Sequence, residues 1–317
     1  MSSATDRPEL LLVAPLMPFL LDQLRQHYTL HDRIHVSDPA AFAAVAPRIR
    51  GVVANGEAKV PRELIAQMPA LEVISVFGVG YDGIDVPAAH ARGVPVTNTP
   101  AVLNDDVADL AIGLLIAAAR RIPQADRFVR ANEWTHGPIA LSRKVTGGRL
   151  GLVGMGRIGQ AIAERALAFK MEVAYTSRSP RAGVPYAYHP DPVSLAAAVD
   201  FLVVITPGGA ATKGLIDARV LQALGPDGYL VNVARGSVVD EAALIDALRH
   251  GTIAGAGLDV FANEPNVPEA LRTLPNVVLT PHIGSGTKQT REAMGQLTFD
   301  NLHAHFTGRP LLTPVDA

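Results

Sequence analysis

The chain contains no cysteine, which excludes disulfide bonds, thiolate metal sites and cysteine nucleophiles. This composition agrees with the reducing cytoplasm, where we expect the protein to be located. Charge is scarce and nearly balanced, since charged residues make up 18% of the 317 residues and the net charge is −2. Because no basic run is long enough to follow a nucleic-acid backbone, we expect neither nucleic acid nor a membrane surface as a partner.

Other chemical signatures are also missing. The most apolar predicted helix, at 110–119, is shorter than the roughly 18 to 20 residues that a membrane span needs. There is no HExxH motif, and His303 and His305 are two positions apart on a predicted helix, so they face different sides and we expect no metal site. No serine stands in a GxSxG elbow, which argues against a serine hydrolase.

The sequence does contain enough apolar residues, at 48%, for a well-packed protein of about two domains. Short aliphatic runs bounded by Gly, Pro or Asn predict buried parallel strands in the first hundred residues, at 9–14, 51–54, 71–77 and 94–97. Helical spacing lies between them at 17–27 and 61–68. These residues therefore predict an α/β unit of their own.

A second alternation of strands and helices follows a long predicted helix at 104–121, for which Asn104 is a candidate N-cap. Strands are predicted near Leu150 and Val173 and at 201–206, 229–233, 255–259 and 277–279, which is typical of a doubly wound parallel sheet. The last helical segment, 288–306, comes after the final strand and need not belong to this second sheet.

The strongest local motif is the glycine pattern in RLGLVGMGRIG, where Gly154, Gly156 and Gly159 stand between a predicted strand and a predicted helix. In this setting the glycines allow a tight turn, backbone approach to a pyrophosphate, and close packing of helix on strand. The intervening Met155, Arg157 and Ile158 belong to the same loop. The pattern predicts dinucleotide binding, with the phosphate charge at the helix N-terminus.

The tip of the next strand lacks the acid that commonly accepts hydrogen bonds from the adenosine ribose of NAD. It reads Ser177, Arg178 and Ser179 instead. A guanidinium and two hydroxyls can bind a 2′-phosphate, which a carboxylate would repel. We therefore predict NADP(H) as the cofactor, with NAD(H) as a weaker alternative; the other interpretation is a solvated polar loop in an enzyme that uses both equally.

Three segments after predicted strands of the second sheet carry residues suited to chemistry, namely VNVARGSVVD, GAGLDVFANEP and VLTPHIGSGT. Arg235 could bind a carboxylate with its planar guanidinium, and His282 could transfer a proton near neutral pH. A glutamate beside the histidine, Glu264, would fix its tautomer and stabilise the imidazolium. Taken singly, each has an ordinary structural explanation: a surface histidine, a helix-start acid and a turn arginine.

With these motifs in family order, the chain resembles the D-isomer-specific 2-hydroxyacid dehydrogenases, and most closely their NADP-dependent glyoxylate/hydroxypyruvate reductase branch. The resemblance extends over nearly the full length and includes VFGVGYDGID at 76–85, NTPAVLNDDVADLAIGLLIAAARR at 98–121 and the three segments above. It implies two Rossmann-like or flavodoxin-like doubly wound α/β domains with the ligand cleft between them. The expected bounds are 1–98 with 288–317 for a discontinuous substrate-binding domain, and 99–287 for the dinucleotide-binding domain.

The resemblance also implies residue roles. Arg235 would bind the substrate carboxylate, and Glu264 would support His282 as the acid–base residue. The other implied substrate-binding residues are Asn55, Gly56, Val79 and Gly80, and the other implied cofactor-binding residues are Thr206, Pro207, Asp259 and Asp109. The region 100–145, which contains Trp134, would form a homodimer interface.

Ser177 and Phe77 depart from the commonest family pattern. Phe77 precedes Gly78 where the family often has a small or polar residue, which leaves the polarity of the substrate pocket open. The predicted function is NADPH-dependent reduction of a small 2-oxo acid to the D-2-hydroxy acid. Two alternatives remain: an NAD-linked D-2-hydroxyacid dehydrogenase for a larger acid, and a non-catalytic NADP-sensing interaction protein.

Overall fold

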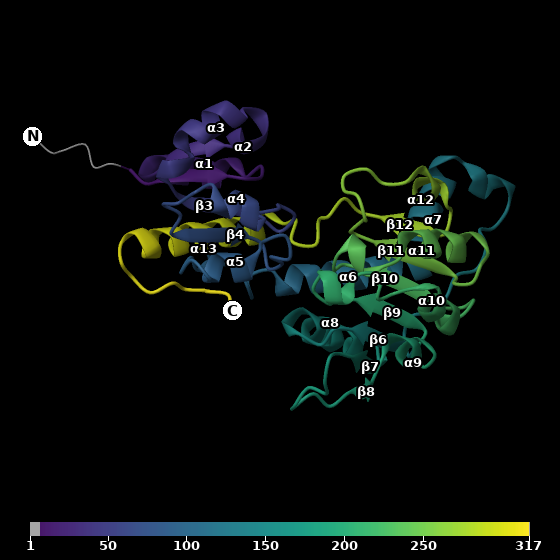
Figure 1. The fold of residues 1–317 in the computed structure, drawn as a ribbon. Coiled ribbons are helices and arrows are strands. Elements are labelled where there is room, and N and C mark those ends of the chain that lie inside the picture. Colours follow the sequence, from purple (N-terminus) through teal and green to yellow (C-terminus); the bar gives the residue numbers. More distant parts are fainter. Residues whose placement is uncertain (1–6, 317) are drawn as a thin grey trace, which may run out of the picture. The chain divides into compact units, whose positions relative to one another are not determined.

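The computed structural model describes residues 7–316 and divides the chain into two compact units. Unit 1 combines Met1–Leu103 with Thr287–Ala317, and unit 2 is Asn104–Gly286. The chain therefore leaves unit 1 and returns to it at the C-terminal end. Figure 1 shows this return in its colours, because the yellow C-terminal helix lies among the purple and blue elements of unit 1.

Unit 1 is built on a five-stranded sheet in which every strand pair is parallel, with the order β2-β1-β3-β4-β5. This is the flavodoxin-like strand order. The strands are β1 Glu9–Leu12, β2 Thr29–Asp32, β3 Ile49–Asn55, β4 Val73–Phe77 and β5 Val96–Thr97. The helices are α1 Pro18–His27, α2 Ile34–Ser37, α3 Pro39–Val45, η1 Ala46–Arg48, α4 Arg62–Ala66, α5 Val86–His90 and α13 Lys288–Phe306.

The central strands of unit 1 are almost continuously apolar because helices cover both faces of the sheet. All five residues of β4 are buried, and α13 packs against this strand. Gly51 on β3 allows close packing, since a Cβ there would lie 2.6 Å from Leu10 Cδ2. The predicted helix 288–306 is confirmed, and it packs on the first sheet rather than the second.

Unit 2 contains a seven-stranded sheet with the order β12-β11-β10-β9-β6-β7-β8, again with only parallel pairs. Read from β8, this is the Rossmann order extended by one strand, and it reverses direction between β6 and β9. The strands are β6 Arg149–Val153, β7 Glu172–Thr176, β8 Ala187–His189, β9 Phe201–Val204, β10 Tyr229–Asn232, β11 Gly255–Leu258 and β12 Val277–Leu279. The predicted class, two doubly wound parallel-sheet α/β domains, is confirmed.

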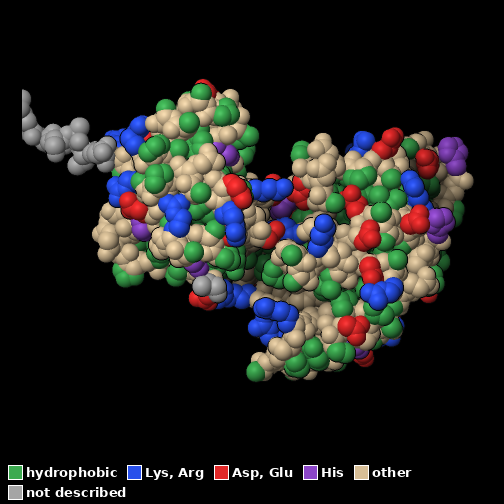
Figure 2. Space-filling view, viewed as in Figure 1, with side chains coloured by type: hydrophobic (Ala, Val, Ile, Leu, Met, Phe, Trp, Pro, Cys, Tyr) green, Lys and Arg blue, Asp and Glu red, His purple; other side chains and the backbone are tan. Residues whose placement is uncertain are grey.

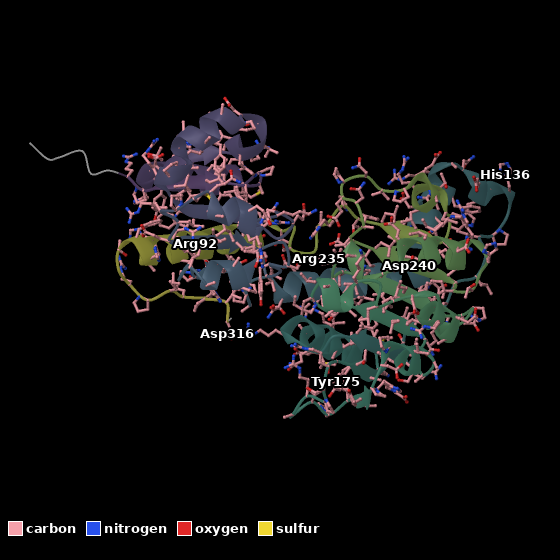
Figure 3. The ribbon with its side chains drawn as sticks, in the orientation of Figure 1. Arg92, His136, Tyr175, Arg235, Asp240 and Asp316 are labelled. Carbon is pink, nitrogen blue, oxygen red and sulfur yellow. The ribbon has the colours of Figure 1, made fainter. Side chains whose placement is uncertain are left out.

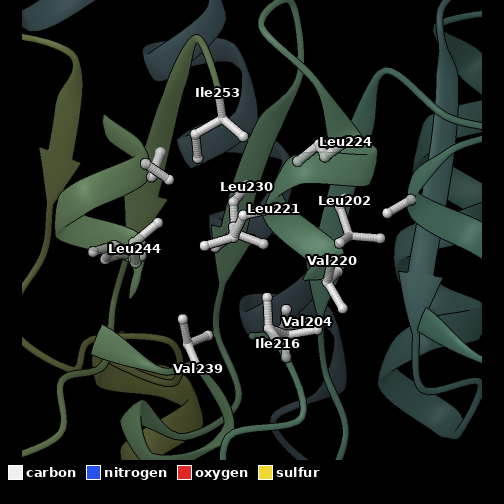
Figure 4. Packing of buried hydrophobic residues seen from close by; sticks show 14 of the residues in the cluster. Leu202, Val204, Ile216, Val220, Leu221, Leu224, Leu230, Val239, Leu244 and Ile253 are labelled. Atoms are coloured by element: carbon white, nitrogen blue, oxygen red, sulfur yellow. The ribbon is translucent and has the colours of Figure 1, made fainter. Parts of the chain in front are cut away.

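The helices of unit 2 cover its sheet on both sides. They are α6 Asn104–Ala119, α7 Ile122–Arg130, η2 Glu133–His136, α8 Arg157–Ala168, α9 Pro192–Ala196, η3 Ala210–Thr212, α10 Ala218–Leu224, η4 Gly236–Val238, α11 Glu241–Arg249 and α12 Glu269–Thr273. Figure 4 shows how side chains from β9, β10, α10 and α11 interlock, among them Leu202, Leu221, Leu230 and Leu244. Burial of such aliphatic side chains is the main favourable term in folding this unit.

The surface carries both signs of charge. On the face drawn in Figure 2, basic and acidic side chains are interspersed over each unit. Among residues 7–316, no helix is long and apolar enough to cross a membrane.

Candidate active site

The glycine loop of unit 2 lies at the point where the strand order reverses, between the carboxyl ends of β6 and β9. Gly154 follows β6 with φ +113°, a conformation that favours glycine, and a Cβ there would lie 2.9 Å from the carbonyl carbon of Ile205 after β9. A Cβ on Gly159 would lie 2.5 Å from the Gly154 oxygen. The first glycine is therefore required by a close contact with the backbone after β9, and the third by a close contact within the loop.

The second glycine leaves space for a ligand, since a Cβ on Gly156 would meet nothing within 4 Å. Gly156 is also the N-cap of α8 and supplies no side chain to the first N–H groups of the helix. These groups and the helix dipole can bind a phosphate. The residues present therefore fit a dinucleotide pyrophosphate.

The remaining loop residues face different surroundings. Met155 is buried, so only its backbone is available to a ligand, whereas Arg157 is exposed and Ile158 is half-buried. Thr206 and Pro207 follow β9 on the other side of the reversal, and the Pro207 carbonyl accepts a hydrogen bond from Thr212 Oγ1 at 2.7 Å. Thr206 and Gly154 are in contact, which brings two segments predicted to bind the cofactor together.

The turn after β7 carries the residues predicted to choose the cofactor. Ser177 Oγ donates to the Ser179 carbonyl at 2.6 Å, and the phenols of Tyr175 and Tyr188 bond the backbone of Arg181 and Ser177. Figure 3 labels Tyr175, from which this turn projects. Arg178 is exposed and makes no hydrogen bond or ion pair within residues 7–316. The turn is thus braced from β7 and β8, with its guanidinium held out in solvent.

Asp109 has a partner within unit 2. Its Oδ1 accepts a hydrogen bond from Arg165 Nε at 2.5 Å, and Arg165 also bonds Asp105 at 3.0 Å. These bonds join α6 to α8, the helix that begins at the glycine loop. A direct role for Asp109 at the cofactor stays a prediction.

Asp259 lies directly after β11, where it organises the turn at 280–284. Its Oδ1 accepts from Thr280 Oγ1 at 2.7 Å and from the Ile283 N–H at 2.8 Å, and its Oδ2 accepts from the Gly284 N–H at 2.8 Å. The side chain is only 1% exposed, and burial raises the pKa of Asp259 although these bonds act in the opposite direction. The predicted contact of Asp259 with the nicotinamide amide stays a prediction.

His282 is held by this turn in a left-handed conformation, with φ +52°. Such a conformation is uncommon for a residue with a side chain and costs of order 1 kcal/mol, so the surroundings must fix it. The His282 N–H donates to the Asp259 carbonyl at 2.8 Å, and the Asp259 carboxylate holds the next two residues. The imidazole is therefore aimed by a constrained backbone.

Glu264 and His282 are brought together as predicted from the sequence. Glu264 Oε2 lies 2.7 Å from His282 Nδ1, while Glu264 Oε1 accepts from the Phe261 N–H at 2.8 Å. The side chains are 20% and 30% exposed, so the pair is shielded but still accessible. A carboxylate at this position selects the tautomer with the proton on Nδ1 and stabilises the imidazolium.

Arg235 follows β10, and Figure 3 labels it on unit 2. Its turn is braced by buried Asn232, whose Nδ2 donates to the Arg235 carbonyl at 3.0 Å. A Cβ on the next residue, Gly236, would lie 1.9 Å from the Phe261 carbonyl carbon, so the Arg235 turn touches the segment that binds Glu264. The three predicted catalytic side chains thus come from adjoining turns of one sheet edge.

Unit 1 brings its own predicted substrate-binding residues together. Asn55 Oδ1 closes a turn by accepting from the N–H groups of Glu57 and Ala58, at 3.1 and 2.9 Å. This turn meets the loop of Val79 and Gly80, since a Cβ on Gly78 would lie 3.3 Å from Gly56 N. The two segments follow the neighbouring strands β3 and β4.

Three residues that hold the turns of the candidate site were not predicted from the sequence. Asn232, Gly236 and Thr280 all lie in the three segments singled out above, but the signals there were taken only from the ionisable side chains. An Asn at a strand end before an Ala-Arg turn is a usable signal, because Asn side chains commonly bond the backbone two or three residues on.

Comparison with known proteins agrees with this architecture. Residues 112–284 match the family model described as D-isomer specific 2-hydroxyacid dehydrogenase, NAD binding domain. The chain is 47% identical over 308 residues to hydroxyphenylpyruvate reductase of Plectranthus scutellarioides, covering 96% of this chain and 98% of the relative. It is 46% identical over 307 residues to glyoxylate/hydroxypyruvate reductase A of Arabidopsis thaliana, with the same two coverages.

A solved structure is similar over the whole fold. It is an NADPH-dependent glyoxylate/hydroxypyruvate reductase from Sinorhizobium meliloti in complex with NADP and malonate, with a TM-score of 0.92, 49% identity, and coverage of 98% of this chain and 97% of that one. The fold and the dinucleotide site thus define an NAD(P)-dependent oxidoreductase. The chain belongs to the D-isomer specific 2-hydroxyacid dehydrogenase family.

The His282–Glu264 geometry generates a prediction about pH. Glu264→Gln retains a group that can accept from Nδ1 but removes the negative charge, so the imidazolium loses its stabilising neighbour. We expect the reduction rate to decline at lower pH than in the parent, with little change at acidic pH. The measurement is the pH profile of single-turnover reduction.

Glu241→Gln is the matched control for this change. Glu241 Oε2 accepts from the Ala262 N–H at 3.1 Å, so this carboxylate on α11 holds the same segment of unit 2 through a backbone bond. Identical profiles for the parent and Glu264→Gln would mean that Glu264 does not act on His282.

Proposed function

We propose that the protein reduces a small 2-oxo acid, such as glyoxylate or hydroxypyruvate, to the D-2-hydroxy acid with NADPH. The observation that carries this proposal is the 2.7 Å pair of His282 and Glu264 beside the Arg235 turn, on the same sheet edge as a dinucleotide loop. The names of the relatives from Arabidopsis thaliana and Sinorhizobium meliloti support the same substrates.

Substrate binding in this proposal depends on the carboxylate of the 2-oxo acid. Arg235 donates two parallel N–H bonds to the two oxygens of this carboxylate, an arrangement that also fixes the direction of the ketone. Within unit 1, the backbone N–H groups of Val79 and Gly80 are the proposed donors to a substrate carboxylate. Asn55 and Gly56 lie beside that loop and contact the substrate side chain.

Proton transfer is assigned to His282. When bound, NADPH supplies the hydride that the ketone carbon accepts. The protonated imidazole donates from Nε2 to the ketone oxygen, which becomes the hydroxyl, and the imidazole is left neutral. Throughout, Nδ1 keeps its proton and donates it in a hydrogen bond to Glu264 Oε2, so the ring is held in the orientation and tautomer that the step requires.

Cofactor choice is assigned to the turn after β7. Arg178 and the hydroxyls of Ser177 and Ser179 bind the 2′-phosphate of NADP(H), while Gly154, Gly156 and Gly159 admit the pyrophosphate. NAD(H) would lose the contact with Arg178 and find no carboxylate for its ribose, so it is the weaker cofactor.

An NAD-linked enzyme for a larger acid is the second candidate. It is favoured by the relative named hydroxyphenylpyruvate reductase and by Phe77, which lies at the end of β4 directly before the proposed carboxylate-binding loop. A non-catalytic NADP-sensing protein is the third candidate. The His282–Glu264 pair is unexplained in that case, because cofactor binding alone does not require an acid–base pair.

Oxidation of reduced cofactor by the purified protein separates the three candidates. Glyoxylate, hydroxypyruvate and hydroxyphenylpyruvate should each be offered with NADPH and with NADH. The proposal expects the largest kcat/KM with NADPH and one of the two small acids. Preference for the aromatic acid with NADH would establish the second candidate, and cofactor binding without turnover would establish the third.

His282→Ala tests the acid–base assignment. Loss of a general acid typically lowers the rate by about 10² to 10⁴, and we expect a fall of this size in kcat with the Kd for NADPH within about twofold of the parent. His250→Ala, an exposed histidine at the end of α11, is the control. Unchanged turnover in His282→Ala would exclude the assignment.

Ser177→Asp with Arg178→Ala tests the cofactor assignment. The new carboxylate would accept the ribose hydroxyls of NADH and repel the phosphate, and loss of the guanidinium removes a contact worth about 1.5 to 3 kcal/mol. We expect the ratio of kcat/KM for NADPH over NADH to fall by at least about tenfold and to reverse. The exposed Arg249→Ala is the control, and a parent that already prefers NADH would refute the assignment.

We further propose that two copies associate through the region 100–145. Within it, Ile122, Val129, Trp134, Ile139 and Leu141 are exposed apolar residues, Trp134 by 69% and Leu141 by 99%. So many exposed large apolar side chains in one segment favour a surface that a second copy covers. We expect sedimentation at twice the 33.4 kDa chain mass and a shift toward monomer in Trp134→Ser with Leu141→Ser, but not in Val36→Ser. A monomeric parent would contradict the proposal.

A further inference from the structure

Two backbone carbonyls of unit 1 are held from one side by the segment at Asn98 and Thr99. The Gly78 carbonyl accepts from the Thr99 N–H at 2.8 Å, and the Val79 carbonyl accepts from Asn98 Nδ2 at 2.9 Å. Gly78 and Val79 form the turn directly after β4. Two successive peptide units of this turn are therefore fixed by neighbouring residues of the strand-end segment after β5.

Fixing these carbonyls also fixes two N–H groups. A trans peptide is planar, with its N–H pointing away from its C=O, so the Gly78 carbonyl sets the direction of the Val79 N–H and the Val79 carbonyl sets that of the Gly80 N–H. Neither N–H makes a hydrogen bond of its own within residues 7–316. Each accepted bond also polarises its peptide and makes the opposite N–H a better donor.

The segment at Asn98 is in turn held by the C-terminal residues. Thr313 Oγ1 donates to the Asn98 carbonyl at 2.6 Å, and the Asn98 N–H donates to the Thr313 carbonyl at 3.3 Å. Beyond it, the Val315 N–H donates to the Val96 carbonyl at 2.8 Å, so the chain end lies along the edge strand β5. In Figure 1 the yellow chain turns back after α13 and continues along the same unit.

Asn301 on α13 fixes Thr313. Its side chain is 0% exposed, and its Nδ2 donates to Thr313 Oγ1 at 2.8 Å and to the Leu297 carbonyl at 2.9 Å. Its Oδ1 accepts from the N–H groups of Leu312 and Thr313, at 3.0 and 3.1 Å. A buried amide with all these bonds made specifies one arrangement, because displacing Thr313 would leave polar atoms buried and unpaired.

We propose that Asn98, Thr313 and Asn301 are positioning residues that aim the Val79 and Gly80 N–H groups at the substrate carboxylate. This inference rests on the proposed function, in which these N–H groups bind a 2-oxo acid. The hydroxyl of Thr313 connects two steps of the network, since it accepts from Asn301 and donates to Asn98. The C-terminal residues thereby determine affinity for the carboxylate without contacting the substrate.

The decisive comparison is Thr313→Val against Thr313→Ser. Valine keeps the size of threonine but removes the hydroxyl, whereas serine keeps the hydroxyl. Asn98→Ala removes the bond to the Val79 carbonyl directly. Thr307→Val is the matched control, because Thr307 Oγ1 donates to the His303 carbonyl at 2.6 Å at the end of α13, away from the network.

Steady-state kinetics with glyoxylate and NADPH provide the readout, with the thermal unfolding midpoint measured alongside. We expect KM for glyoxylate to rise about tenfold in Asn98→Ala and about fivefold in Thr313→Val, since misdirected donors weaken one charge-assisted contact. KM for NADPH and kcat should stay within about twofold of the parent, because binding rather than the chemical step is altered. Thr313→Ser and Thr307→Val should match the parent.

Each contrary outcome has a distinct meaning. An active parent with unchanged KM for glyoxylate in both Asn98→Ala and Thr313→Val would overturn the inference and leave the proposed function standing. The inference would also be overturned if KM for glyoxylate rose equally in Thr307→Val and Thr313→Val, in proportion to the fall in the unfolding midpoint. The role of Thr313 would then be structural only. A parent that reduces no 2-oxo acid would overturn the proposed function and this inference with it.

Discussion

The Asp259 carboxylate is the interaction on which the geometry of the candidate catalytic group depends. It is buried at the end of β11 and accepts three hydrogen bonds from residues 280–284, while its own carbonyl accepts from the His282 N–H. Desolvation of a carboxylate is costly, and these donors offset the cost only if the turn keeps its shape. The left-handed backbone of His282 is thereby tied to the stability of the sheet edge.

Close backbone contacts extend this constraint to the neighbouring turns. Gly236 lies so near the Phe261 carbonyl that any side chain would collide with it, and Phe261 in turn donates its N–H to Glu264. The backbone of Arg235 therefore has a fixed position relative to Glu264, which orients His282. Carboxyl ends of parallel strands meet at one sheet edge. Here Gly236 and the Asp259 carboxylate fix the turns at that edge, and these turns carry Arg235, Glu264 and His282.

Much of this fold could be predicted because its central strands are apolar throughout and its longest helices, α6 and α13, have clear periodicity. The short helices α2, α3 and α5 were not predicted. Two strands were missed, β2 and β8, which lie at sheet edges. The residues of β2, Thr29–Asp32, are partly polar and none is buried, so they lack the aliphatic run that signals a central strand. Edge strands pack on one side only, and their sequences are correspondingly less constrained.

The candidate site could also be predicted only in part, because only its ionisable side chains are recognisable in the sequence. Ionisable residues after strands, such as Glu264 and His282, can be identified as candidates from their residue type and position. The residues that hold them are harder to recognise. Asn232 acts through a bond to the Arg235 carbonyl that depends on the local turn, and Thr280 acts through a bond to the Asp259 carboxylate, which is 21 positions away in sequence. For Asp259 the sequence indicated a position at the sheet edge but not the three donors around its carboxylate.

Each unit holds its own proposed substrate-binding groups through internal hydrogen bonds. In unit 2 the bonds of Asp259, Glu264 and Asn232 fix the side chains that would bind and protonate the substrate. In unit 1 the bonds from Asn98 and Thr99 fix two backbone donors, and a buried asparagine on the last helix secures them. The donors and acceptors of each set are therefore ordered by the unit that carries them. Preorganisation of this kind lowers the cost of binding, because the donors need no ordering when the substrate arrives.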